Sequence, residues 1–246
     1  MTATPRPGPT HLAVVMPAYG ELPNLRELLP RLVDVAAMVP GLRLDVHPVL
    51  PVEASEAEVQ ELTALGAHPV RRGPTDSFGD AIRSGIAAAD ESAQFVIIMD
   101  ADGSHSPETI PRLLEALGDA DVAVASRYTH GGSSDNAFVL RLMSRLLNDS
   151  FRLILGIGCT DLSTNFKLYR RVDLAQIRQT CRDFDVVEEI LFRLKQLHGG
   201  HLRIVEVPDR FHERRHGETK RRLGPFIVSY MTTLLRLRLH HGQGAS

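Results

Sequence analysis

Short apolar runs alternate with amphipathic segments along the first half of the chain. The runs are rich in Val and Ile, as in buried parallel strands, and the segments between them carry apolar residues every three or four positions, as in helices. The predicted strands are residues 12–16, 42–46, 67–70, 95–99 and 122–125. This regular alternation predicts an α/β fold, in which helices cover both faces of a mostly parallel sheet.

Polar and small residues mark the predicted helix starts. Asn24 is placed to cap a helix, and Ser55 with Glu58 forms a capping box for the next one. The helix over residues 80–89 is rich in small side chains, which allows close packing on the sheet. Ser106 is placed to cap a helix that follows the 95–99 strand. The predicted buried face of the first helix consists of Leu25, Leu28, Leu29, Leu32 and Val33.

The pattern changes after the Gly131–Gly132 pair. Residues 139–155 predict a helix with one apolar and one basic side, which can dock on the protein or lie on a membrane. Residues 166–169 and 202–207 are predicted strands, and residues 187–197 are a predicted helix. Residues 225–241 predict a second basic amphipathic helix. It would be about 25 Å long, short of the ~30 Å hydrocarbon core, so it can lie on a membrane but not cross it.

Composition narrows the class of protein. With 246 residues, 43% hydrophobic and 24% charged, the chain can bury a full core, and a net charge of -2 argues against general binding of nucleic acid. Cys159 and Cys181 are far apart and no signal-peptide pattern is present, so we expect neither a disulfide framework nor a zinc site. We expect a cytoplasmic protein that does not cross a membrane unaided, because no run approaches ~18 apolar residues.

The first candidate for chemistry is the acidic pair Asp100 and Asp102, which stands where the 95–99 strand should end. In open α/β sheets, ligands bind beyond the carboxyl ends of the strands. Two carboxylates one residue apart can share a hard divalent cation that also binds phosphate oxygens. The pair is therefore a predicted metal site, and the alternative is a solvated loop whose acids only start a helix.

An ordered series of motifs then resembles the family 2 glycosyltransferases of the GT-A (Rossmann-like) fold, most closely the dolichyl-phosphate (polyprenyl-phosphate) mannose synthases. The resemblance covers about residues 12 to 235. It rests on Val14–Glu21, Ile97–Glu108, Ser126–Gly132, Ser144 with Arg145 and Asn148, Asp161–Arg170, Glu189, Val205–Pro208, and Arg214 with Gly217, Thr219 and Lys220.

The resemblance implies an inverting transfer of a hexose, with mannose from GDP-mannose as the first candidate, onto a polyprenyl phosphate. Mg2+ or Mn2+ would bind the donor diphosphate. A phosphate acceptor is already anionic, so it needs cationic groups rather than a general base. The implied roles are donor binding for Pro17, Tyr19, Glu21, Glu53 and Asp100, metal binding for Asp100, Asp102 and Ser104, catalysis for Asp102, Arg127 and Glu189, and acceptor-phosphate binding for Ser144, Arg145, Arg214 and Lys220.

The residue pattern together with the resemblance divides the chain. We expect a disordered lead over residues 1–10, a nucleotide-sugar-binding half over 11–132, an acceptor-binding half over 133–224, and an amphipathic C-terminal helix and tail over 225–246. Carboxy-terminal membrane helices found in many bacterial and archaeal relatives are absent from the sequence, so membrane contact would be peripheral, on the cytoplasmic face.

Three stretches depart from the family pattern. Val52–Ser55 stands where the family usually has Asp-Asp-x-Ser, Gly20 replaces an Asn, and Ser77–Gly79 replaces a glycine-rich loop. Two alternatives therefore stay open. One is the same fold acting on a soluble small-molecule acceptor, which would need Glu189 or Asp161 as a base. The other is a catalytically silent nucleotide-sugar-binding or scaffold protein.

Overall fold

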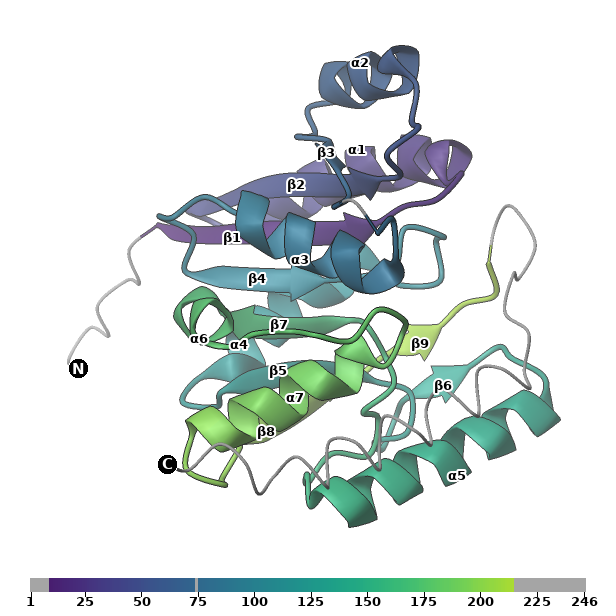
Figure 1. The fold of residues 1–246 in the computed structure, drawn as a ribbon, viewed down its shortest axis with the longest axis vertical. Helices are drawn as coiled ribbons and strands as arrows, with labels where there is room; N and C mark the ends of the chain where they lie inside the picture. Colours follow the sequence, from purple (N-terminus) through teal and green to yellow (C-terminus); the bar gives the residue numbers. More distant parts are fainter. Residues whose placement is uncertain (1–8, 74, 215–246) are drawn as a thin grey trace.

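The computed structural model describes residues 9–73 and 75–214, and these form one seven-stranded sheet with a small second sheet (Figure 1). The strand order is β3-β2-β1-β4-β7-β5-β8. Only β7 runs antiparallel to its neighbours, so the predicted mostly parallel sheet is confirmed. The strands are β1 (Thr10–Pro17), β2 (Leu42–Leu50), β3 (Val70–Arg71), β4 (Phe95–Ile98), β5 (Val122–Ser126), β7 (Lys167–Arg170) and β8 (Ile204–Pro208).

Helices cover both faces of this sheet, as predicted. Successive strand residues point to opposite sides, so the apolar strands have two apolar faces to bury. In β1, Ala13 and Val15 face the core shared with α3 and α7, whereas Leu12 and Val14 face the core shared with α1 and α4. In Figure 1, α3 and α7 lie in front of the sheet. The helices are α1 (Leu22–Met38), α2 (Glu56–Ala64), α3 (Phe78–Ala88), α4 (Ile110–Leu117), α5 (Phe138–Leu155), α6 (Arg171–Gln176) and α7 (Val186–Leu197).

Two predicted helix caps are wrong and one is confirmed. Helix α1 begins at Leu22, so Asn24 lies in its first turn and donates to Glu21 Oε2 at 2.6 Å. Ser106 does not cap the helix that follows it. Its hydroxyl lies 3.1 Å from His212 Nε2, and the segment opens with a 3-10 turn, η1 (Pro107–Thr109), before α4. The Ser55 side chain does cap α2, because it accepts from the Glu58 backbone N–H at 3.2 Å.

Helix α3 packs closely on β1, as its small residues predict. A side-chain carbon placed on Gly85 would lie 2.2 Å from Val15 Cγ1, so only glycine allows this approach. The helix starts two residues before the predicted Asp80, with Ser77 as its N-cap. On α1, the predicted core residue Val33 is 59% exposed, and Val35 is buried in its place.

The second half of the chain is less regular than predicted. Strand β7 inserts between β4 and β5, so the two predicted halves share one sheet. A two-stranded sheet, β6 (Ser133–Ser134) with β9 (Arg210–Phe211), was not predicted. None of the helices in the described residues is both long and apolar enough to span a bilayer. The predicted helix over residues 225–241 lies outside the described residues.

Helix α5 forms as predicted, but its predicted apolar face is only partly buried. Phe151 and Leu155 reach the core, whereas Val139, Leu142 and Leu146 are 63%, 47% and 59% exposed. The buried residues all lie in the C-terminal half of the helix because its N-terminal half extends past the sheet (Figure 1). An apolar stripe with basic neighbours is therefore left on the surface.

Candidate active site

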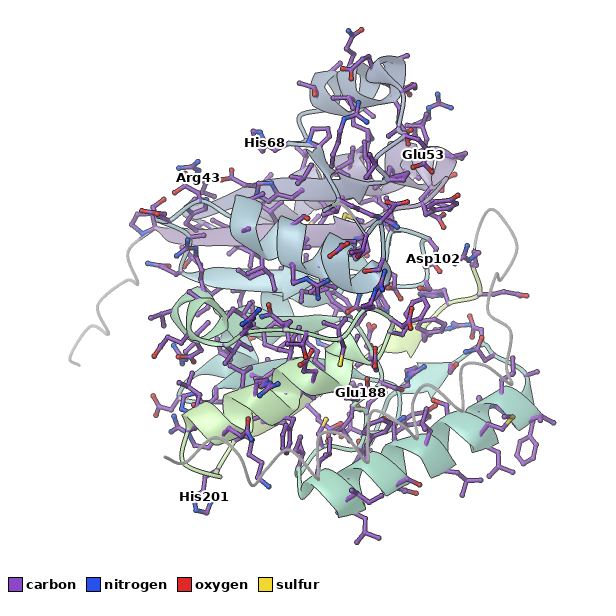
Figure 2. All side chains as sticks on the ribbon, viewed as in Figure 1. Arg43, Glu53, His68, Asp102, Glu188 and His201 are labelled. Carbon is purple, nitrogen blue, oxygen red and sulfur yellow. The ribbon has the colours of Figure 1, made fainter. Side chains whose placement is uncertain are left out.

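The loop after β4 presents both predicted metal-binding acids at the carboxyl edge of the sheet. In Figure 2, Asp102 and Glu53 lie on the side toward which β1, β2 and β4 point, and Arg43 and His201 lie on the opposite side. Gly103 has a φ of 80°, a left-handed conformation that suits glycine in a tight turn. The Ser104 backbone N–H donates to Asp102 Oδ1 at 3.0 Å, and its hydroxyl donates to the same oxygen.

Arg214 closes this loop from the far end of the described chain. Its Nη2 lies 3.0 Å from Asp102 Oδ2, and its Nη1 donates to Glu21 Oε1 at 3.0 Å. Burial would raise the pKa of Asp102, but the Ser104 hydrogen bonds and the nearby positive charge of Arg214 outweigh burial and lower it. Arg214, predicted at the acceptor phosphate, therefore lies between a predicted metal ligand and a predicted donor-binding residue.

Arg127 is held by a second carboxylate. Its Nε and Nη2 donate to the two oxygens of Asp161 at 2.8 and 2.6 Å, and its Nη2 also donates to Ser163 Oγ at 2.9 Å. Burial works against both charges, but their mutual attraction prevails, so the pKa of Arg127 is raised and that of Asp161 is lowered. Both groups stay charged at neutral pH in this fully hydrogen-bonded pair.

A chain of hydrogen bonds joins Arg127 to the predicted acceptor helix. Asn148 on α5 donates from Nδ2 to Ser163 Oγ at 3.0 Å and to the Ser144 carbonyl at 2.8 Å. Arg145, one residue along, is exposed, and its guanidinium lies 5.2 Å from the Tyr128 ring centre. The Arg127 guanidinium lies 5.0 Å from the same ring. The structure thus brings Ser144 and Arg145 to the neighbourhood of Arg127.

A small pocket of about 40 Å³ is shared by Asp100 and Arg127. Asp100, Arg127 and Asn165 supply polar lining, and Phe78 and Phe184 supply an apolar wall. Asn165 Nδ2 donates to Asp100 Oδ1 at 3.1 Å, which fixes one carboxylate oxygen just beyond the carboxyl end of β4. The pocket therefore offers a carboxylate and a guanidinium beside aromatic rings, a lining suited to a polar ligand with apolar faces.

The predicted donor-binding residues lie at the ends of β1 and β2. Pro17 is the last residue of β1, and Tyr19 is 48% exposed, with the Arg72 guanidinium 5.6 Å from its ring centre. Glu53 is exposed on the loop after β2. Arg72 donates from Nη2 to the Ala18 carbonyl at 3.0 Å, and so it fixes the loop that carries Tyr19.

Glu189 is engaged by hydrogen bonds to residues outside the predicted site. It is fully buried on α7 and accepts from the Thr180 N–H, the Thr180 hydroxyl and the Cys181 N–H at 2.7 to 2.8 Å. Burial would raise the pKa of Glu189, but these hydrogen bonds prevail and lower it. These hydrogen bonds give Glu189 the environment of a structural carboxylate, and the catalytic role expected for it stays a prediction. Lys220 lies outside the described residues.

The donor set around Asp100 and Asp102 fits one mode of metal binding. Within the described residues, no three His, Cys, Asp or Glu side chains gather to hold an ion by themselves. Mg2+ is commonly bound by one or two carboxylates together with substrate phosphates and water, and this loop offers the two carboxylates. The Ser104 hydroxyl, a predicted ligand, is buried and turned toward Asp102, where it orients the carboxylate.

Sequence reasoning did not assign His105, Asn165 and Arg72 to the site. All three contact predicted site residues or their loops. His105 and Asn165 stand inside motifs that carry the family resemblance, which is the one available signal. Their residue types alone do not indicate which way their side chains point.

A family model and two named relatives match most of the chain. The family model described as Glycosyl transferase family 2 matches residues 13–178. The chain is 34% identical to an undecaprenyl-phosphate mannosyltransferase of Micrococcus luteus, covering 84% of this chain and 85% of that one. It is 32% identical to a polyprenol monophosphomannose synthase of Mycolicibacterium smegmatis, covering 89% of this chain and 83% of that one.

A solved structure shares the fold. The chain matches a glucosyl-3-phosphoglycerate synthase of Mycobacterium tuberculosis, crystallised with Mn2+, UDP-glucose and glycerol 3-phosphate, with a TM-score of 0.65 and 20% identity. The match covers 94% of this chain and 80% of that one. The predicted GT-A fold is thereby confirmed.

Proposed function

The chain belongs to glycosyltransferase family 2 and is a glycosyltransferase, and we propose that it transfers mannose from GDP-mannose to the phosphate of a polyprenyl carrier with the help of Mg2+ or Mn2+. The observation that carries the proposal is the cluster at the carboxyl edge of the sheet. There the acids of the Asp100–Asp102 loop meet arginines from distant parts of the chain, Arg214 at 3.0 Å from Asp102 and Arg127 on the same pocket as Asp100. Carboxylates for a metal and guanidinium groups for phosphates are the two components that this reaction requires.

Asp100 and Asp102 would hold the metal, and a bound divalent ion would neutralise negative charge on the leaving diphosphate. The chain itself prepares Asp102 for this role. Two hydrogen bonds from Ser104 fix Oδ1 of Asp102, and Oδ2 is paired with Arg214. Because these contacts lower its pKa, Asp102 is ionised at neutral pH before any metal ion binds. Arg214 would provide a second positive charge beside the diphosphate.

The acceptor argument rests on the environment of two carboxylates in the described part of the chain. An alcohol acceptor must lose a proton to a base, whereas a phosphate is already ionised. The two carboxylates considered as bases are Glu189 and Asp161, and the oxygens of both are engaged by hydrogen bonds that lower their pKa values. Neither is poised to take a proton near pH 7, which favours a phosphate acceptor over a soluble alcohol.

The mannose and polyprenyl parts of the proposal come from the relatives. Two relatives that match most of the chain are named as an undecaprenyl-phosphate mannosyltransferase and a polyprenol monophosphomannose synthase. A polyprenyl acceptor keeps its chain in a bilayer, so the enzyme would work at the cytoplasmic face of a membrane. The exposed apolar stripe of α5, with Arg145 beside it, supports this peripheral location.

The test is a matched set of transfer assays. The full chain with Mn2+ is given GDP-mannose, GDP-glucose or UDP-glucose, together with a short polyprenyl phosphate, the corresponding polyprenol without phosphate, or glycerol. The proposal expects nucleotide release and lipid-linked sugar only with GDP-mannose and the phosphate. Transfer to glycerol would replace it with the soluble-acceptor alternative, transfer to polyprenol would show that the acceptor is an alcohol and not a phosphate, and transfer from UDP-glucose alone would overturn the donor.

A further inference from the structure

We propose that His105 is a positioning residue that fixes Asp100, both its backbone and its carboxylate, in the geometry for metal binding. This inference rests on the proposed function, because it assigns Asp100 to the metal. His105 lies in the same loop, is buried, and lines the same pocket as Asp100.

The hydrogen bonding settles which ring nitrogen carries the proton. The Asp100 backbone N–H donates to His105 Nδ1 at 3.1 Å, so Nδ1 is an acceptor. The ring in this arrangement is therefore neutral and carries its hydrogen on Nε2. Nε2 lies 3.9 Å from Asp100 Oδ2 and has no hydrogen-bond partner among the described residues. That distance is too long for a direct bond but suits a single bridging water or ligand hydroxyl.

Packing prevents the imidazole from turning away. Its ring stacks on Phe166, with centroids 5.0 Å apart and planes inclined by 23°. The edge of a second ring, Phe211 on β9, meets it with centroids 5.5 Å apart. A side chain held between two aromatic rings can impose its orientation on a neighbour, as a support for metal ligands must.

Asp100 is thereby held at its backbone N–H and at one carboxylate oxygen. Its backbone N–H is fixed by His105, its Oδ1 accepts from Asn165, and its Oδ2 faces the polar Nε2–H of His105. The companion acid, Asp102, is held by an independent set, Ser104 and Arg214. Because the two sets of partners share no residue, loss of the His105 ring nitrogens removes a hydrogen bond of Asp100 and none of those that hold Asp102.

Three substitutions separate the contribution of each ring nitrogen of His105 from that of its aromatic packing. His105→Phe keeps a flat ring between the two phenylalanines but removes both nitrogens. His105→Asn places an amide oxygen near the position of Nδ1, and His105→Gln places its amide near the position of Nε2. Two measurements are made on the full chain: exchange of the Asp100 amide followed by NMR without metal, and Mn2+ binding in the presence of GDP.

We expect His105→Phe to keep a melting temperature close to that of the wild type, lose protection of the Asp100 amide, and bind Mn2+ about 10 to 100 times more weakly. His105→Asn should retain amide protection, and His105→Gln should lose it. Unchanged protection and unchanged Mn2+ binding in His105→Phe would overturn the inference. If that variant does not fold, equal protection in the Asn and Gln variants would overturn it instead.

The outcome is distinguishable from failure of the proposed function. A wild-type protein that binds Mn2+ and GDP but transfers no mannose would refute the proposed substrates and leave the result at His105 intact. A wild-type protein that binds no Mn2+ would remove the metal from both proposals and would overturn the inference as stated. The amide-exchange measurement would then report only whether His105 still orders the loop.

Discussion

Arg214 Nη2 lies 3.0 Å from Asp102 Oδ2, so an arginine beyond the last strand pairs with an acid of the loop after β4. The same guanidinium holds Glu21 at the start of α1. One side chain therefore joins three segments that are distant in sequence, at the edge of the sheet where the donor is proposed to bind.

Asp102→Asn should abolish transfer and weaken donor binding in the presence of Mn2+. The amide removes the negative charge that both a divalent ion and Arg214 require. Transfer and GDP binding are measured with Mn2+ and with excess chelator. Asp119→Asn is the matched control, because Asp119 is exposed in the turn before β5, at the other edge of the sheet. Full wild-type activity in chelator would refute a metal requirement.

Arg145→Ala and Arg214→Ala should differ in which substrate they affect. Arg145 is exposed on α5 near Tyr128, so its loss should raise the KM for the acceptor alone. Arg214 contacts Asp102 and Glu21, so its loss should raise the KM for donor and acceptor together. Each removes charge-assisted bonds worth about 1.5 to 3 kcal/mol, or roughly 10- to 100-fold. Identical profiles for the two variants would contradict this division of roles.

Asp161→Asn should destabilise the protein strongly. It leaves the buried Arg127 charge without its bidentate partner, a change that typically costs about 3 to 5 kcal/mol. Urea unfolding at neutral pH measures the loss. Asp34→Asn serves as the control because Asp34 is exposed on α1 and should change stability little. A small effect at Asp161 would mean that water reaches the pair.

Asp80 should contribute to stability only above acidic pH. Burial would raise its pKa, but hydrogen bonds from Thr75 and Arg83 prevail and lower the pKa of Asp80 to about 2. Because the folded pKa is below the unfolded value of about 3.9, the contribution is complete above that value and is lost as pH falls toward 2. The free energy of unfolding of Asp80→Asn should therefore depend less on pH between about 4 and 2. A slope equal to that of the wild type in that window would exclude this contribution.

The exposed stripe of α5 decides between lipid and soluble acceptors. Replacing Val139, Leu142 and Leu146 with Ser should reduce binding to anionic liposomes and activity on long-chain polyprenyl phosphate, with donor binding unchanged. Thermal stability should hardly change, because all three side chains are exposed. Val33→Ser on α1 is the control, as Val33 is equally exposed far from this helix in sequence. Liposome binding that survives the triple substitution would exclude α5 as the contact.

The sequence by itself determined the fold class and the position of the acidic loop after β4. Side chains repeat their direction about every two residues in a strand and every 3.6 residues in a helix. The apolar run from Leu12 to Met16 and the apolar helix face from Leu25 to Leu32 can therefore be recognised without knowledge of any long-range contact. Asp100 and Asp102 directly follow an apolar run in the sequence, and the end of a parallel strand lies at the carboxyl edge of the sheet. Their position could therefore be predicted from local sequence alone. The family motifs then added the expected chemistry.

Tertiary structure alone decided which charges meet. Nothing in the sequence indicates that Arg214 pairs with Asp102, that Arg127 is held by Asp161, or that Glu189 is buried against Thr180 and Cys181. The insertion of β7 between β4 and β5 brings Asn165 beside Asp100, and strand order of this kind is not encoded in hydrophobic periodicity. The partners of a charged side chain come from segments that are distant in sequence and meet only in the folded sheet. Whether the side chain acts as a ligand, a counter-ion or a structural support is therefore decided by the tertiary structure.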